Sequence, residues 1–191
     1  MQVDYSIELG PGDPALELPW TSEDGAVRYY NLKQHPDLVL NIEEARNHRE
    51  LSEFLSRINA ASSPLQTAKC DAWFSEELFP EEEIFGVACK FVCYVDLLFL
   101  TNELQSSLEK HEWLAQNLCY LLQRAPEMAA AVEFLVRRCY YRLHGSEDSM
   151  DGFHITAYVT GYGDSQEEAM QRWAIALKLL QHALIQVTVS L

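Results

Sequence analysis

The spacing of apolar residues changes several times along the chain, and each change marks a predicted element. Three segments place apolar residues at every third or fourth position, the spacing that puts side chains on one face of a helix. They predict helices over residues 41–59, 106–125 and 164–187. Their apolar stripes are Ile42, Ala45, Leu51, Phe54, Leu55 and Ile58; Leu108, His111, Leu114, Leu118, Leu121, Leu122 and Ala125; and Ala169, Trp173, Leu177, Leu180, Leu184 and Val187.

Each predicted helix follows a polar residue with a glutamate three positions later, the capping-box pattern. The three pairs are Asn41 with Glu44, Ser106 with Glu109, and Asp164 with Glu167. These pairs predict the residues at which the helices begin.

Strand-like segments lie between the predicted helices. Residues 38–40 form a short apolar run, and residues 66–74 alternate between polar and apolar side chains. The segment from 84 towards 100 predicts a second strand of a hairpin with an acidic tip. Residues 127–143 combine a helix-like start with β-favouring side chains, and we interpret 132–143 as a strand that turns through 145–152 into a strand over 153–162.

These elements predict an α+β fold in the order β-α-ββ-α-ββ-α, with an antiparallel sheet and helices packed mainly on one face. Residues 1–35 contain turn-forming glycines and prolines and predict an irregular N-terminal arm, within which residues 3–9 alternate weakly, as an edge strand does. Residues 36–191 predict a single domain, because this length is enough to bury one core.

Two helix–hairpin units share residue spacings, which raises the hypothesis of an internal duplication. His48, Leu51, Leu55 and Ile58 have the spacing of His111, Leu114, Leu118 and Leu121, and Phe85, Val87, Tyr94 and Asp96 have that of Phe153, Ile155, Tyr162 and Asp164. Amphipathic helices share such spacings by chance, so the helical match is weak evidence. The alternative is coincidence.

The net charge narrows the classes of partner. The chain has 191 residues, with 14 Lys and Arg against 29 Asp and Glu, a formal net charge of −15. Such a surface repels nucleic-acid phosphate and anionic membranes and favours a basic protein partner. The candidate contact residues are the acidic tips of the two predicted hairpins: Glu81, Glu82 and Glu83, and Glu147, Asp148 and Asp151. The alternative is that these charges only keep the protein soluble.

The cysteine pattern and the N-terminal residues predict a cytoplasmic protein. Five cysteines at scattered spacings favour free thiols in a reducing compartment. The first ten residues include two acids and no basic residue, so we expect no secretory signal. The apolar run over 87–100 is interrupted by Lys90 and Asp96, so we expect no membrane span.

No motif in the sequence indicates a catalytic residue, a metal site or a cofactor. Cys89 and Cys93 would lie about 13 Å apart on a strand, too far for one zinc ion. The sequence Gly161-Tyr162-Gly163 lacks the third glycine of a dinucleotide loop and precedes acidic residues, so we read it as a turn. A Cys139–His154 pair across a hairpin is the remaining nucleophile candidate.

Three function classes follow. The element order and the acidity resemble those of small acidic secretion chaperones, which would imply a protein-binding role and pairing as dimers. An immunity-like protein that neutralises a basic toxin is a second binding function. We therefore expect a non-enzymatic acidic binding module for a basic or amphipathic protein, compatible with a homodimer through the sheet or the last helix. The alternative is an enzyme or small-ligand binder, for instance with Trp113, Tyr158 and Trp173 around an apolar cavity.

Overall fold

A six-stranded mixed sheet forms the centre of the computed structural model, which describes residues 1–22, 24–142 and 149–189. Five strands follow the order β1-β5-β6-β4-β3, and β2 pairs with a later part of β5. The strands are β1 (Gln2–Glu8), β2 (Leu16–Leu18), β3 (Leu65–Ser75), β4 (Cys89–Phe99), β5 (Ala130–Arg142) and β6 (Ser149–Gly163).

The sheet is not wholly antiparallel, so that part of the sequence prediction is wrong. The hairpins β3–β4 and β5–β6 are antiparallel, as is the β4–β6 pair that joins them. Both β1 and β2 run parallel to β5. The difference arises because the segment predicted as an irregular arm adds two strands to the outer edge of β5.

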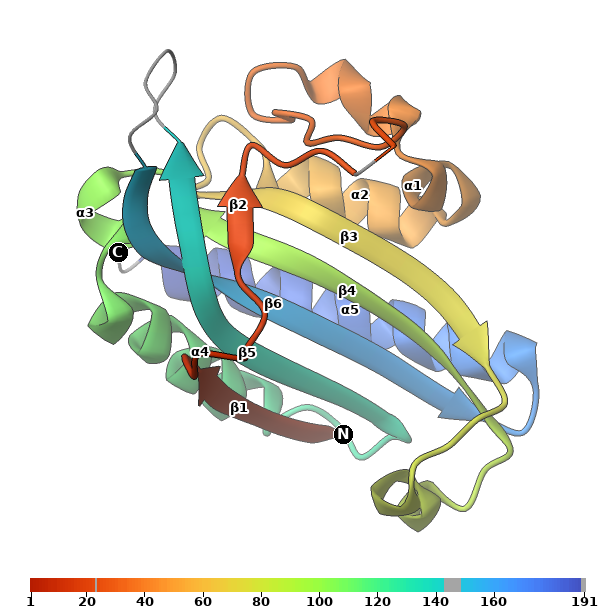
Figure 1. Ribbon diagram of the computed structural model, residues 1–191. Helices are drawn as coiled ribbons and strands as arrows, with labels where there is room; N and C mark the ends of the chain where they lie inside the picture. The colour runs from red at the N-terminus through yellow and green to blue at the C-terminus, as the bar shows by residue number, and fades with distance from the viewer. Residues whose placement is uncertain (23, 143–148, 190–191) are drawn as a thin grey trace.

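The main helices cover one face of the sheet and leave the other face to the N-terminal segment (Figure 1). The helices are α1 (Glu43–Asn47), α2 (Arg49–Ile58), α3 (Asn102–Gln105), α4 (Leu108–Leu122) and α5 (Gln166–Thr188), with 3-10 turns η1 (Pro36–Asn41) and η2 (Pro80–Phe85). The long helix α5 contacts α2, α4, β4 and β6. Its Trp173 is 1% exposed and anchors the main core, to which a buried side chain of this size contributes about 2–3 kcal/mol.

Alternation along β4 explains why both faces of this central strand are buried. Cys89, Phe91 and Cys93 belong to the core beneath the helices. The even-numbered residues of β4 point to the other face. One of them, Leu98, joins a second cluster with Leu16 of β2. The sheet therefore has a large core on its helical face and a small core under the N-terminal segment.

The helix starts differ from the predicted capping pairs by one residue or more. The Ser107 and Ser165 side chains cap α4 and α5 by accepting from the backbone amides of Lys110 and Glu168. Asn41 caps no helix, because residues 36–41 form a 3-10 turn that begins at Pro36. The strand predicted over residues 38–40 is accordingly wrong.

The structure gives no support to the duplication hypothesis. Phe153 and Ile155 lie in strand β6, whereas Phe85, the counterpart of Phe153, lies in the turn η2. Asp96 is buried within β4, whereas Asp164 follows the end of β6. The matched spacings therefore fall on different parts of the two hairpins.

The N-terminal segment crosses one end of the open face from β5 to β3. Strand β2 lies in front of the sheet in Figure 1, with Leu16 and Leu18 buried. The indole N–H of Trp20 then donates to the carbonyl of Ala68 on β3 at 3.2 Å. This crossing covers one end of the open face and leaves the other end accessible.

Across the described ranges of the chain, no helix is both long enough and apolar enough to cross a bilayer.

Candidate functional site

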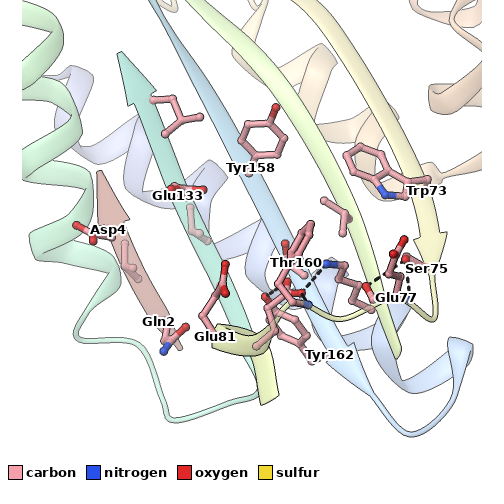
Figure 2. Close-up of a pocket in the computed structure, with 18 residues that line it drawn as sticks. Gln2, Asp4, Trp73, Ser75, Glu77, Glu81, Glu133, Tyr158, Thr160 and Tyr162 are labelled. Carbon is pink, nitrogen blue, oxygen red and sulfur yellow. Dashed lines mark hydrogen bonds and ion pairs between the residues drawn. The ribbon is translucent and has the colours of Figure 1, made fainter. Parts of the chain in front are cut away.

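The uncovered end of the open sheet face forms a groove of about 850 Å³ (Figure 2). We call it the open-face groove. Strands β1, β3, β4, β5 and β6 form its floor, and the turn η2 forms one wall. Its lining includes Asp4, Trp73, Phe79, Glu81, Glu133 and Tyr158.

Strand pairing aligns polar and aromatic residues in one row across the sheet face that holds the groove. Asp4 on β1 pairs with Glu133 on β5, which pairs with Tyr158 on β6. Tyr158 pairs with Tyr94 on β4, and Tyr94 pairs with Asp71 on β3. Because side chains alternate along each strand, these five register partners share a face of the sheet. Residues far apart in sequence thereby form one continuous surface.

Aromatic rings form the middle of this row. The ring centroids of Tyr94 and Tyr158 are 5.7 Å apart, and those of Tyr94 and Trp73 are 6.5 Å apart. Trp73 is 39% exposed, and both tyrosines are half-buried. The floor therefore includes the aromatic side chains of Trp73 and Tyr158.

The negative charge of the groove is largely uncompensated. Arg137 lies near Glu133 and by itself would lower the pKa of that carboxyl, but Arg137 forms an ion pair with Glu8 at 2.8 Å. Burial, Glu8 and Asp4 together raise the pKa of Glu133, and their effect exceeds that of Arg137. A cation placed beside Glu133 would relieve this repulsion.

The wall η2 is attached to the sheet through Glu82. Its carboxylate accepts hydrogen bonds from Lys90 Nζ at 2.6 Å and from the Tyr162 hydroxyl at 2.9 Å. Burial favours a higher pKa for Glu82, but hydrogen bonds from Lys90, the Phe79 amide and Tyr162 outweigh burial and lower it. Phe85 stacks on Tyr162 with ring centroids 4.2 Å apart. Among the described residues that line the groove, Lys90 is the one lysine, and Glu82 on the wall already neutralises it.

A buried polar cluster lies on the same sheet face. Asp96 Oδ1 accepts a hydrogen bond from Thr156 Oγ1 at 2.7 Å and lies 3.7 Å from His154 Nε2. Burial, followed by repulsion from Arg137, lowers the pKa of His154 to about 3. The imidazole is therefore neutral at physiological pH.

The predicted Cys139–His154 pair does not form a nucleophilic site. In the β5–β6 register, Cys139 lies opposite Gly152 and His154 lies opposite Arg137. Burial raises the pKa of Cys139 to about 12, which disfavours a thiolate. All five cysteines are free, and Cys89 and Cys93 lie on one strand face as predicted. Within the described residues, no group of three or more His, Cys, Asp and Glu side chains suits a metal ion.

The predicted aromatic cavity is also absent from the described residues. Trp173 is fully buried in the main core, and Trp113 packs against that core. Tyr158 lies on the opposite sheet face, in the open-face groove.

The structure separates the predicted acidic contact residues. Glu81 and Glu82 line the groove, and Glu83 is exposed on η2. Glu147 and Asp148 lie outside the described residues. Asp151, at the start of β6, is about 35 Å along that strand from Tyr162, which contacts η2. Asp151 is therefore far from the turn that holds Glu81, Glu82 and Glu83.

The groove residues Asp4, Trp73 and Glu133 were not identified as candidates from the sequence, and Tyr158 was placed in a different, apolar cavity with Trp113 and Trp173. Each is an isolated polar or aromatic residue on a different strand, and only the register brings them together. A charged residue between apolar neighbours, as at Glu133 within Val132–Phe134, is the one local sign of an open sheet face.

No match to a known protein was found: no family model, no curated protein and no solved structure matches this chain.

Proposed function

We propose that this protein is a non-enzymatic binding module that docks a basic segment of a protein partner in the open-face groove. The observation that carries the proposal is charge complementarity on an uncovered sheet face. Asp4, Glu77, Glu81 and Glu133 line the groove, and Lys90, the one lysine among its described lining residues, is paired with a fifth carboxylate, Glu82. A basic segment would neutralise charges that the fold leaves uncompensated.

The groove also has apolar surface for an amphipathic segment. Val92 and Leu135 contribute to its floor, and Phe79, 57% exposed, stands at its wall. Aromatic and aliphatic contacts supply most of the affinity in protein interfaces, whereas exposed charges mainly supply steering and specificity. The proposal therefore covers both an immunity-like and a chaperone-like role, with a basic partner in each.

Docking on the face is favoured over pairing at the sheet edges. The outer strands β1 and β3 each have a backbone amide satisfied by a neighbouring aspartate: Tyr5 N–H by Asp4 at 2.8 Å and Ala72 N–H by Asp71 at 2.7 Å. Charged side chains at these positions hinder the addition of another strand. Homodimerisation through the sheet or the last helix stays a prediction.

The expected compartment remains the cytoplasm, since five free thiols suit a reducing environment. The same charge that favours a basic partner disfavours nucleic acid and anionic lipid.

Site-specific photo-crosslinking tests this proposal. A photoreactive phenylalanine analogue replaces Trp73 in the groove or, as a control, Ile175, which is 47% exposed on α5. Each variant is irradiated in a lysate of the source organism at low and high salt, and the products are identified by mass spectrometry. We expect a basic protein crosslinked at position 73 at low salt, lost at high salt and absent from position 175. A crosslink at position 175 alone, or none at position 73, would contradict docking in the groove.

A further inference from the structure

The aromatic part of the open-face groove has a geometry that distinguishes between cationic side chains. Trp73 and Tyr158 line it, and Tyr94 lies between them on β4, with neighbouring ring centroids 6.5 and 5.7 Å apart. Tyr158 is the register partner of Glu133, so an aromatic side chain and a carboxylate lie on neighbouring strands of the same sheet face. Figure 2 shows both side chains at the floor of the groove.

Glu133 is the carboxylate best placed to anchor a bound cation. It is exposed on β5 between Asp4 on β1 and Tyr158 on β6, and its neighbour Arg137 is held by Glu8 at 2.8 Å. The other groove carboxylates are engaged or lie away from Tyr158. Glu82 binds Lys90, and Asp4 accepts a hydrogen bond from the Tyr5 amide. Glu77 and Glu81 lie after the end of β3 and on η2. A cation bound at Glu133 would therefore meet a carboxylate that forms no ion pair within the described residues, with an aromatic ring beside it.

We infer that the open-face groove seats an arginine side chain of its basic partner, stacked on Tyr158 and paired with Glu133, in preference to lysine. This inference rests on the proposed function. A guanidinium group is planar, stacks on aromatic rings and presents paired N–H donors to a carboxylate. An ammonium group is compact and strongly hydrated, so it gains less from an aromatic floor. Stacking on an exposed ring contributes about 0.5–1 kcal/mol, and bidentate pairing adds to it.

Binding of arginine and lysine homopeptides tests the inference. Fluorescein-labelled peptides of equal length, one of arginine and one of lysine, are titrated with the protein at low and high salt, and fluorescence anisotropy gives Kd. We expect both peptides to bind at low salt, with the arginine peptide bound roughly fivefold to tenfold more tightly. An acidic homopeptide of the same length should not bind.

Variants assign the preference to the two residues. Tyr158→Leu should remove most of the arginine preference while leaving lysine-peptide affinity nearly unchanged, and Tyr158→Phe, which keeps the ring, should retain the preference. Glu133→Gln should weaken both peptides several-fold. The matched controls lie away from the groove: Tyr120→Leu, at an exposed tyrosine of α4, and Glu127→Gln, at an exposed glutamate before β5. Both controls should bind like the unmodified protein.

The outcomes distinguish failure of the arginine preference from failure of the proposed docking of a basic segment. Equal affinity for the two peptides, with Glu133→Gln still weakening both, would contradict the preference for arginine at Tyr158 and Glu133. It would still agree with docking of a basic segment in the groove. Binding of neither peptide, or binding unaffected by Tyr158→Leu and by Glu133→Gln, would contradict both the arginine preference and the proposed function. Because Tyr158 and Glu133 lie on the open face, near-equal melting temperatures are expected for all variants and are checked alongside.

Discussion

Thr156 Oγ1 donates a hydrogen bond to Asp96 Oδ1 at 2.7 Å, on a part of the sheet face where both side chains are at most 5% exposed. Burial raises the pKa of Asp96 to about 6, although this hydrogen bond and the charges of Lys69 and Arg137 act in the opposite direction. The folded protein therefore retains a proton that the unfolded chain releases near pH 4. Stability attributable to Asp96 falls as the pH rises from about 4 through about 6.

Asp96→Asn should stabilise the protein above pH 6 by up to about 2–3 kcal/mol. The reason is that asparagine has no charge to bury, whereas ionised Asp96 opposes folding at this pH. The asparagine oxygen can still accept from Thr156. Urea unfolding of the variant and the unmodified protein at pH 5 and 7.5 measures the difference, which should grow with pH. The control Asp71→Asn alters an exposed aspartate on β3 and should show no such trend. A stability difference independent of pH would refute the role of Asp96.

Glu82→Ala should destabilise the protein by about 3 kcal/mol, because it leaves buried Lys90 without its partner and Tyr162 without its acceptor. Thermal and urea unfolding measure the loss. Glu83→Ala removes an exposed glutamate from the same turn and should leave Tm nearly unchanged. Equal effects of the two substitutions would mean that Glu82 does not attach η2 to the sheet.

Gly161→Ala should destabilise the protein by about 2–4 kcal/mol, since its Cβ would lie 2.2 Å from the Ala169 carbonyl oxygen and from the Trp173 amide nitrogen. Both contacts are backbone atoms of α5, which cannot move aside cheaply. Gly12→Ala is the matched control, because a Cβ there meets nothing within 4 Å. Chemical denaturation compares them, and a tolerated Gly161→Ala would show that α5 packs less closely on β6.

No cysteine should behave as a reactive thiolate in the native protein. Burial raises the pKa of Cys93 and Cys139 to about 12 and of Cys119 to about 11, and it also raises the pKa of Cys70 and Cys89. We expect slower reaction with Ellman's reagent at pH 8 than for a free model thiol, and release of all five thiols in denaturant. One thiol that reacts faster than the model thiol would revive the enzyme alternative.

Local sequence patterns were sufficient for much of the fold. The stripe of Trp173, Leu177 and Leu180 predicted the longest helix, and β-favouring side chains after Val132 predicted β5 despite a helix-like start. Both signals depend on neighbours within a few positions, where helix and strand periods differ clearly. The prediction failed at residues 38–40, where Pro36 starts a 3-10 turn that apolar content alone does not reveal.

The sequence by itself determined the α+β class, the negative charge and the two hairpins, because these follow from composition and from local periodicity. The tertiary structure decided that β1 and β2 join β5 in parallel and that the N-terminal segment covers only one end of the open face. It also placed Asp4, Glu133 and Tyr158 side by side, although more than 120 residues separate the first from the second. Strand register is set by packing across the whole sheet, so no local pattern encodes the surface on which the proposed function depends.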